Sequence, residues 1–186
     1  MAHKAQRDFV EKVKRSFPLF FFNSSVIDIG SRDVNGTNRD HFHNCEYVGI
    51  DVTEGPNVDV VMPGHEYDSD PVDVTISTEC FEHDMFWDKT IRNMIRLTKN
   101  GGLFIFTCAS DGRPEHGTRA SSEGEEHWDQ ALWPDYYMNL NEAHIRQAIN
   151  VDKTFSSYGF VVNGSDLYFF GVKGHSLECS NGRFLV

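Results

Sequence analysis

The hydrophobic positions of the chain fall into short runs that are separated by polar or glycine-containing segments. Five such runs lie at 26–30, 47–51, 58–62, 72–78 and 102–108, and two more lie at 158–164 and 166–174. They are rich in Val, Ile and Phe and end in polar or small residues, which is typical of buried strands. The last two runs meet at Asn-Gly-Ser, and Asn-Gly between strand-like runs predicts a hairpin.

Three segments show a helical spacing of apolar residues. In residues 3–17 apolar side chains recur every four positions, which places them on one face. The segment 84–99 ends in Lys-Asn-Gly-Gly, a cation followed by glycines, which predicts a helix C-terminus. The segment 141–150 follows a candidate N-cap at Asn139 or Asn141. A helix between two strand runs predicts a crossover connection and a parallel strand pair.

Together these elements predict an α/β fold. We expect a doubly wound, mostly parallel seven-stranded sheet with a C-terminal antiparallel hairpin, in one domain over residues 1–186. Residues 1–22 would form an N-terminal helical segment. Residues 110–140 would form a long loop, and a loop of this length inside a compact domain is usually functional or disordered. Its large aromatic residues argue against disorder.

Composition and charge narrow the range of functions and partners to expect. The net charge of −11 over 186 residues repels phosphates and anionic lipids, so nucleic acid and membrane partners are not expected. The four cysteines are scattered without a C-x-x-C pair, which favours a reduced cytoplasmic setting and predicts no structural metal. The apolar stretch FPLFFF is too short to span a membrane and lacks a small-residue cleavage site.

Polar residues follow the strand runs at the positions where doubly wound sheets bind ligands. Gly30-Ser31-Arg32-Asp33 follows the first run, Asp51 ends the second, and Ser77-Thr78-Glu79 ends the fourth. An acid about 20 residues after the first glycine is placed to accept hydrogen bonds from ribose hydroxyls. The pyrophosphate-binding spacing G-x-G-x-x-G is absent, because Arg32 stands at its second glycine. Each feature has a plainer interpretation, in which Gly30 serves a tight turn and Asp51 a turn or helix cap.

Three stretches resemble class I S-adenosylmethionine-dependent methyltransferases. They are VIDIGSRDVNG, YVGIDVTEGPNVDVV and DVTISTECFEHDMFWDKTIRNMIRLTKNGGLFIFT, and the likeness extends from about Val26 to Thr107. The first motif resembles a subgroup with a DIGSRDVNG-type sequence. The resemblance implies a Rossmann-like methyltransferase fold, S-adenosyl-L-methionine as cofactor and S-adenosyl-L-homocysteine as product.

The resemblance also implies roles for individual residues. It puts Asp28, Gly30, Ser31 and Arg32 near the methionine part of the cofactor, Asp51 at the ribose, Val52 and the Gly64-His65 turn at the adenine, and Glu79 near the methionine amine and carboxylate. The chain departs from the family pattern at Pro63, where an acidic residue often contacts the adenine amine. His65 or Glu66 would then take that role. Arg32 would hold the cofactor carboxylate or pair with a neighbouring acid.

The loop 110–140 is the expected entrance for the methyl acceptor. His116, His127, Trp128, Trp133, Tyr136 and Tyr137 are candidates for its wall. His116 is the first choice for acid–base work because an unperturbed histidine titrates near pH 6.5, and Tyr136 is a candidate substrate contact. His83 would face the acceptor or cap the following helix. The aromatic residues have the alternative role of packing the loop down.

Three functions remain open at this point. The first is methyl transfer to a small molecule, sugar or metabolite, for which the sulfonium supplies an activated methyl group and the protein mainly aligns the acceptor. The second is a nicotinamide-dependent oxidoreductase, which would require the G-x-G-x-x-G turn that this chain lacks. The third is a non-catalytic domain that binds S-adenosylmethionine or a protein partner. The acceptor and the oligomeric state do not follow from the sequence.

Overall fold

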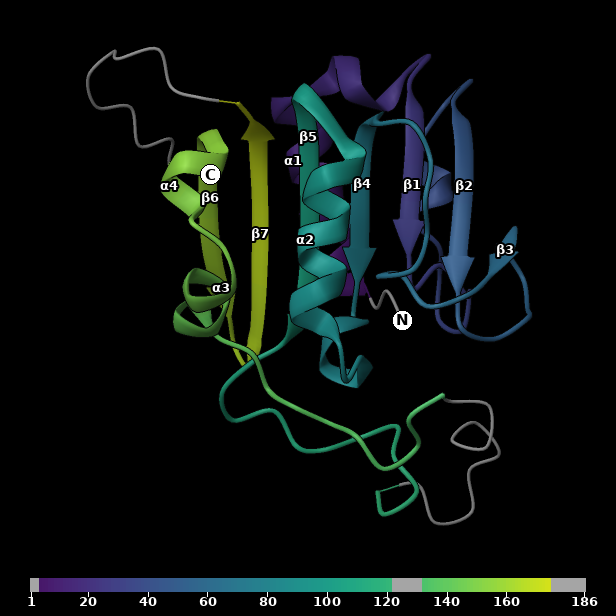
Figure 1. Ribbon diagram of the computed structural model, residues 1–186, viewed down its shortest axis with the longest axis vertical. Helices are drawn as coiled ribbons and strands as arrows, with labels where there is room; N and C mark the ends of the chain where they lie inside the picture. The colour runs from purple at the N-terminus through teal and green to yellow at the C-terminus, as the bar shows by residue number, and fades with distance from the viewer. Residues whose placement is uncertain (1–3, 122–131, 175–186) are drawn as a thin grey trace.

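A seven-stranded sheet forms the centre of the protein. The computed structural model describes residues 4–121 and 132–174. The strand order is β3-β2-β1-β4-β5-β7-β6 (Figure 1). The strands are β1 Ser25–Ile29, β2 Glu46–Asp51, β3 Val60–Val61, β4 Val72–Thr78, β5 Thr98–Ala109, β6 Phe155–Asn163 and β7 Asp166–Lys173. The pairs from β3 to β5 are parallel, and β7 is antiparallel to both β5 and β6. The predicted fold class is confirmed.

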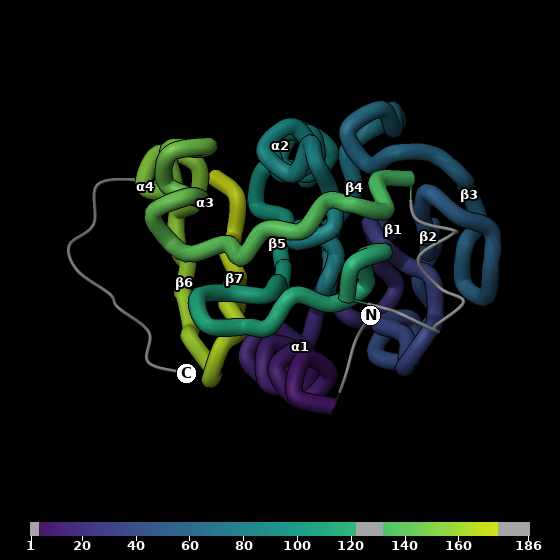
Figure 2. Tube along the Cα trace, turned by 90° about the horizontal axis from the view of Figure 1, so that it is seen from below, coloured from purple at the N-terminus to yellow at the C-terminus, as the bar shows by residue number. Residues whose placement is uncertain are grey.

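Helices cover both faces of the sheet. Helix α1, Lys4–Ser16, lies on one face, and α2, Trp87–Leu97, lies on the other together with α3, Glu142–Ala148, and α4, Val151–Thr154 (Figure 2). Alternation along β5 divides the core, because successive strand residues point to opposite faces. Leu103 and Ile105 pack in the cluster of α1, whereas Phe104 and Phe106 pack in the cluster of α2.

Helix α2 ends earlier than the sequence predicts. The segment was expected to be helical up to Lys99, but α2 stops at Leu97 and β5 begins at Thr98. Thr98 pairs with Val72 and Leu103 pairs with Val74, so the intervening residues of β5 bulge out. Gly101, with φ +80°, provides the bend. The glycines therefore serve a β-bulge, and the prediction of a helix C-terminus there is wrong.

Two further boundaries differ from the expectation. The apolar run 58–62 pairs with β2 only through Val60 and Val61. The predicted helix 141–150 divides into α3 and α4. The first helix ends at Ala148 with Ile149 in an extended conformation, and Asn150 caps the second by accepting a hydrogen bond from the amide of Lys153. Asn141, one of the two proposed caps, forms a capping box with His144.

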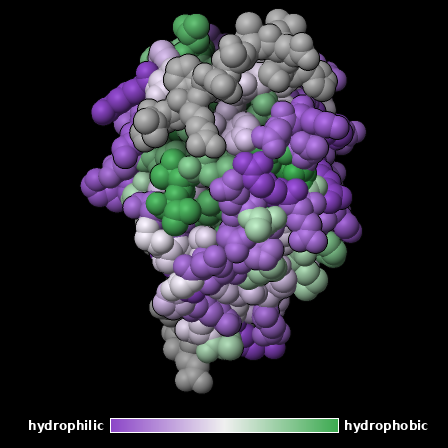
Figure 3. All heavy atoms as spheres, turned by 90° about the vertical axis from the view of Figure 1, so that its left-hand side faces the viewer, coloured by the Kyte–Doolittle hydropathy of each residue, from purple (hydrophilic) through white to green (hydrophobic). Residues whose placement is uncertain are grey.

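The hairpin predicted from Asn163-Gly164 is present between β6 and β7. Asn163 pairs with Asp166 across Gly164 and Ser165, and Gly164 has φ +64°. The hairpin places β6 at the edge of the sheet, where both polar and apolar residues reach the surface (Figure 3). Within 4–121 and 132–174, no helix has the length and apolar character needed to cross a membrane.

Candidate active site

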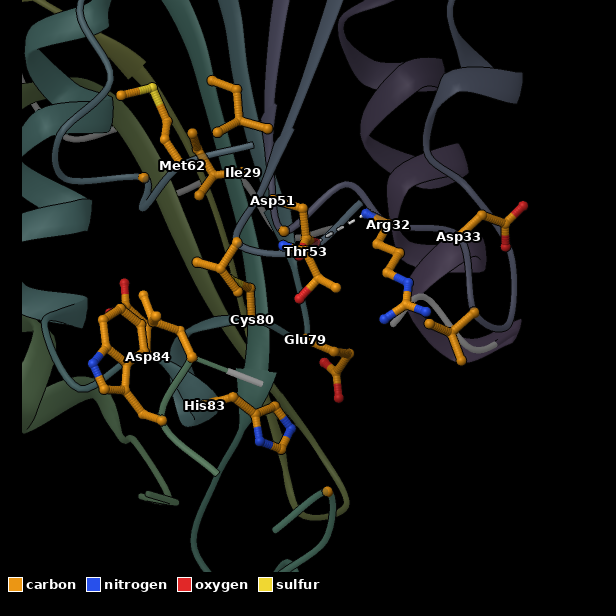
Figure 4. A pocket seen from close by; sticks show the side chains of 18 of the residues that line it. Ile29, Arg32, Asp33, Asp51, Thr53, Met62, Glu79, Cys80, His83 and Asp84 are labelled. Atoms are coloured by element: carbon orange, nitrogen blue, oxygen red, sulfur yellow. Dashed lines mark hydrogen bonds between the residues drawn. The ribbon is translucent and has the colours of Figure 1, made fainter. Parts of the chain in front are cut away.

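A cavity of about 410 Å³ opens at the carboxyl ends of the parallel strands. The turns after β1, β2 and β4 form most of its wall, and the segment after β3 and two arms of the loop between β5 and α3 contribute the rest. Its lining consists of Ile29, Gly30, Arg32, Asp33, Val34, Ile50, Asp51, Val52, Thr53, Pro56, Met62, Gly64, Glu79, Cys80, His83, Asp84, Gly117, Leu132 and Trp133 (Figure 4). This volume is within the range of small-ligand sites.

The turn after β1 is fixed by packing and by backbone hydrogen bonds. Gly30 has φ +78°, and a Cβ there would lie 2.6 Å from the Cβ of Cys80, so only glycine fits. The amides of Gly30 and Ser31 both donate to the carbonyl of Ile50, at 2.8 and 3.1 Å. The hydroxyl of Ser31 donates to the carbonyl of Asn57 and is buried. The chain therefore follows one path between the ends of β1 and β2.

Asp51 faces the cavity from the end of β2. Its carboxylate accepts the amide of Arg32 at 3.1 Å and the amide of Thr53 at 3.2 Å. Burial raises the pKa of Asp51, and these two amides oppose that shift. Each carboxylate oxygen has more than one lone pair, so the group can accept further hydrogen bonds from hydroxyls in the cavity.

Arg32 brings a positive charge to a cavity whose other charged lining groups are acidic. Its side chain lies against Gly55, where an added Cβ would be 2.8 Å from Nε. Among the described residues its guanidinium has no ion pair, and Figure 4 shows it and the carboxylate of Glu79 projecting into the open space. The cavity thus presents a guanidinium for an anionic group and carboxylates for a cationic one.

Asp28 does not line the cavity, contrary to its expected place beside a ligand. It alternates with Ile27 and Ile29 along β1, so its side chain lies on the other face of the sheet. The hydroxyl of Tyr47 donates to it at 2.6 Å, and Nδ2 of Asn38 donates at 3.3 Å. Burial raises the pKa of Asp28 to about 6, against the effect of these two donors.

Of the two adjacent residues Gly64 and His65, only the first lines the cavity. Gly64 lines the cavity and packs so closely on Ile29 that a Cβ would lie 2.5 Å from Cγ2 of that residue. The ring of His65 lies outside the lining, 4.9 Å from the ring of Phe86 and 6.5 Å from that of Trp133. His65 therefore supports the wall formed by Trp133.

The E-x-x-E-H sequence forms the turn after β4. Glu79 lines the cavity with φ +51°, an uncommon backbone conformation for a residue with a side chain, and such residues cluster at functional sites. The hydroxyl of Thr107 donates to Glu79 at 3.0 Å, and burial raises the pKa of this carboxyl. The 3-10 helix Phe81–His83 follows and brings His83 into the lining.

Two titratable groups of this turn, one buried and one partly buried, have shifted pKa values. Burial, together with the charge of Glu79, raises the pKa of Glu82 to about 8. Burial and the neighbouring His116 lower the pKa of His83 to about 3, so its imidazole is neutral at physiological pH. The polar contacts at the start of α2 come from Asp84, which accepts hydrogen bonds from the amide of Phe86 at 2.8 Å and from the hydroxyl of Thr90. The proposed capping role of His83 is therefore filled by its neighbour.

An aromatic cluster lies behind His83. The rings of His116 and Tyr137 are 5.1 and 5.5 Å from that of His83, and 5.0 Å from each other. His116 contacts His83 but is not part of the lining. The hydroxyl of Tyr136 donates to the sulfur of Met138 at 3.5 Å, and Tyr136 also lies outside the lining. The other two proposed wall residues, at 127 and 128, lie outside the described residues.

The sequence family agrees with this geometry. Residues 1–162 match a family model described as a methyltransferase domain. The chain belongs to this methyltransferase family. No curated protein matches it in sequence. The family and the fold confirm the resemblance inferred from the three sequence stretches, while the DIGSRDVNG subgroup stays a prediction.

Solved structures with the same fold include several methyltransferases. One is the 1,6-didemethyltoxoflavin-N1-methyltransferase of Burkholderia thailandensis with bound 1,6-didemethyltoxoflavin and S-adenosylhomocysteine, at 13% identity and TM-score 0.56, covering 93% of this chain and 92% of that chain. Another is the N-methyltransferase NodS of Bradyrhizobium japonicum with S-adenosylhomocysteine, at 14% identity and TM-score 0.60, covering 92% and 88%. The phosphoethanolamine N-methyltransferase 2 of Haemonchus contortus shows 21% identity and TM-score 0.57, covering 85% of this chain and 38% of that longer chain.

The cavity collects many, but not all, of the residues singled out from the sequence. Those in its lining are Gly30, Arg32, Asp51, Val52, Gly64, Glu79, His83 and Trp133, and those outside it are Asp28, Ser31, His65, Glu66, His116, Tyr136 and Tyr137. Sequence reasoning missed Asp84 as a lining residue, although it directly follows E-x-x-E-H. It also gave no role to Glu82, whose place in that motif, three residues after Glu79, was the available signal.

Proposed function

We propose that the protein is an S-adenosyl-L-methionine-dependent methyltransferase that acts on a small-molecule acceptor. The observation that carries this proposal is the combination, in one cavity, of Asp51, the Arg32 guanidinium and the Glu79 carboxylate beside an apolar wall. The cofactor has a matching set of groups, namely ribose hydroxyls, a carboxylate, an amine and an apolar adenine face. Its sulfonium is positively charged, and the acidic lining favours that charge.

Each end of the cofactor then has a partner. Asp51 accepts hydrogen bonds from the ribose hydroxyls, while Val52 and Ile50 contact the adenine. Arg32 binds the methionine carboxylate, and Glu79 binds the amine. Ser31 and Gly30 hold the turn that brings Arg32 into place, and His65 supports the adenine side through Trp133. Asp28 lies on the other face of the sheet and acts indirectly, through its hydrogen bonds with Tyr47 and Asn38.

Methyl transfer needs little from the protein beyond alignment. A lone pair of the acceptor forms a bond to the methyl carbon while the bond between that carbon and sulfur breaks, and the electron pair of the broken bond stays on the sulfur of S-adenosylhomocysteine. The protein holds the two reactants in line and excludes water. We place the acceptor beside His83 and the described arms of the loop between β5 and α3, with His116 and Tyr136 as further candidates for acid–base work or substrate contact.

The acceptor class is inferred from charge and from similar proteins. The net charge of −11 disfavours a nucleic acid substrate. The names of the B. thailandensis and H. contortus proteins specify small acceptors, 1,6-didemethyltoxoflavin and phosphoethanolamine, and the second protein is seen with phosphomonomethylethanolamine bound. A small molecule, sugar or metabolite is therefore the proposed substrate, and the cytoplasmic location stays a prediction.

A thermal shift experiment tests the cofactor. The full chain is melted alone and with millimolar S-adenosylmethionine, S-adenosylhomocysteine or NAD. A ligand present at 100 times its Kd stabilises the native state by about 2.7 kcal/mol. We expect a shift with the first two ligands and none with NAD. A shift with NAD alone would favour an oxidoreductase, and no shift with any ligand would remove the cofactor assignment.

Activity needs a separate test, because a domain that only binds the cofactor would give the same shift. Methyl-labelled S-adenosylmethionine is incubated with the protein and a metabolite extract. We expect label on one or a few small molecules. Tight cofactor binding without transfer to any component would support the non-catalytic alternative.

A further inference from the structure

Glu82, His83 and His116 form a cluster next to the cavity. One ligand atom from each of the three side chains lies within 4.8 Å of those of the other two. Two of them come from the turn after β4, and the third comes from the loop after β5. The cluster therefore joins segments that are 33 positions apart in the chain, from His83 to His116.

Glu82 has a surrounding that is unusual for a carboxylate. Its side chain is fully buried, with an exposed fraction of 0%. In the described part of the chain no side chain donates a hydrogen bond to its carboxylate oxygens, and the backbone amides of Glu82 and Ala109 are the donors that favour its charged form. No described Lys or Arg forms an ion pair with it. Buried carboxylates are normally paired with a cation or hydrogen-bonded, or they coordinate a metal. Glu82 instead faces two imidazoles.

Each imidazole has contacts that orient its ring. Nδ1 of His116 lies 3.1 Å from the carbonyl oxygen of Pro114, which only accepts, so Nδ1 carries the proton and Nε2 has the lone pair. A backbone carbonyl on the second ring nitrogen is the usual arrangement around a metal-binding histidine. His83 is held between the ring of Tyr137 and Gly117, where an added Cβ would lie 2.9 Å from its Cε1.

We propose that Glu82, His83 and His116 bind a divalent cation of the first transition row. One carboxylate and two neutral imidazoles are ligands that suit Zn²⁺ or Mn²⁺ better than Mg²⁺, which prefers oxygen. Three protein ligands leave at least one coordination position open. The ligand atoms must approach one another by roughly 1 Å, because metal–ligand bonds of about 2.1 Å require shorter separations than 4.8 Å. Side-chain rotations supply that movement.

The open position would face the acceptor, since His83 lines the cavity. This part of the inference rests on the proposed function. A hydroxyl or amine of the acceptor that occupies the position would be polarised and fixed in direction, and its proton would leave more readily. Glu79, in the same turn, adds a second negative charge near the cation.

Calorimetry on untagged full-length protein tests the site, because a histidine tag would bind the same ions. The protein is stripped with a chelator and titrated with Zn²⁺, Mn²⁺ or Mg²⁺. We expect one equivalent to bind, with Zn²⁺ tightest and Mg²⁺ weakest. His116→Gln should weaken binding by at least about 100-fold, since even indirect support of a ligand contributes 10–100-fold. Glu82→Gln should do the same, and His43→Gln, an exposed histidine elsewhere, should not.

The outcomes are decisive. Equal binding by the wild type, His116→Gln and His43→Gln, or no equivalent bound, would overturn the cation site. His116 is only partly buried, so this variant keeps the test valid if Glu82→Gln fails to fold. Titration of the same stripped protein with S-adenosylhomocysteine separates the two proposals. Cofactor binding without cation binding rejects the cation site alone, and cation binding without cofactor binding rejects the proposed function alone.

Discussion

The two sides of the cavity are built in different ways. On the side of β1 and β2, short turns are fixed by backbone hydrogen bonds, such as those from Gly30 and Ser31 to Ile50, and by contacts that leave no room for a side chain. On the side of β4 and β5, ring contacts among His83, His116 and Tyr137 hold the wall, with backbone bonds such as that from Met138 to Glu82.

This difference corresponds to two tasks. The cofactor is one defined molecule, and a rigid set of strand ends can be shaped to it. The acceptor differs among the similar methyltransferases named above, and loops are the elements that tolerate such variation. We therefore expect changes on the β1–β2 side to affect stability and cofactor binding, and changes on the loop side to affect transfer.

The largest effect is expected at Gly30. Gly30→Ala combines a left-handed backbone, φ +78°, with a Cβ at 2.6 Å from Cys80. It should lower the free energy of unfolding by about 2–4 kcal/mol, the sum of the backbone and overpacking costs. Gly112→Ala is the matched control, because Gly112 has φ +86° but open space around it, and should cost about 1–2 kcal/mol. Equal costs in urea unfolding would show that the turn is less tightly packed than the structure indicates.

Asp28 gives a pH-dependent test of the same side. Its pKa rises from 3.8 to about 6 in the folded protein, so the folded state binds the proton more tightly than the unfolded state. The resulting stability is fully present below pH 3.8 and is lost as the pH rises through 6. The loss is at most about 3 kcal/mol, at 1.36 kcal/mol per pKa unit. Asp28→Asn should remove this loss, so the difference in unfolding free energy between the two proteins should change from pH 3.5 to 7. If the unfolding free energies of the two proteins varied with pH in parallel, the raised pKa of Asp28 would be contradicted.

Substitution of Asp51 tests the β1–β2 side of the cavity through its effect on S-adenosylhomocysteine binding. Asp51→Asn should weaken S-adenosylhomocysteine binding by about 1.5–3 kcal/mol, or roughly 10- to 150-fold, as expected for hydrogen bonds to a charged group. Asp70→Asn, at an exposed position, is the control and should bind normally. Tyr137→Phe, on the loop side, should also bind the cofactor normally. If Tyr137→Phe and Asp51→Asn weakened binding equally, the division between the two sides would fail.

Substitution of Arg32 has the smallest expected effect on cofactor binding, but it tests directly whether this residue binds the ligand carboxylate. Arg32→Gln should weaken S-adenosylhomocysteine by about 1–2 kcal/mol because an ion pair with the carboxylate is lost in a partly open cavity. Binding of 5′-methylthioadenosine, which lacks the amino acid part, should not change. An equal loss for both ligands, measured by calorimetry, would mean that Arg32 supports the turn rather than the carboxylate.

The same division explains what could be predicted from sequence. The strand runs and the polar residues at their ends are local patterns, so Asp51 and Glu79 could be placed at the cavity. The direction of a side chain depends on alternation and packing, which is why Asp28 and His65 were expected in the lining but lie outside it. The bulge at Gly101 depends on the register between β4 and β5, which no local pattern encodes. The approach of His116 to Glu82 required the path of a long loop.

The central claim is that the cavity between Arg32, Asp51 and Glu79 holds S-adenosylmethionine. A crystal structure of the full chain with S-adenosylhomocysteine tests it most directly. We predict the ribose hydroxyls on the carboxylate of Asp51, the ligand carboxylate on Arg32, and the sulfur directed toward His83. A ligand found elsewhere on the protein, or no ligand bound at millimolar concentration, would contradict the account.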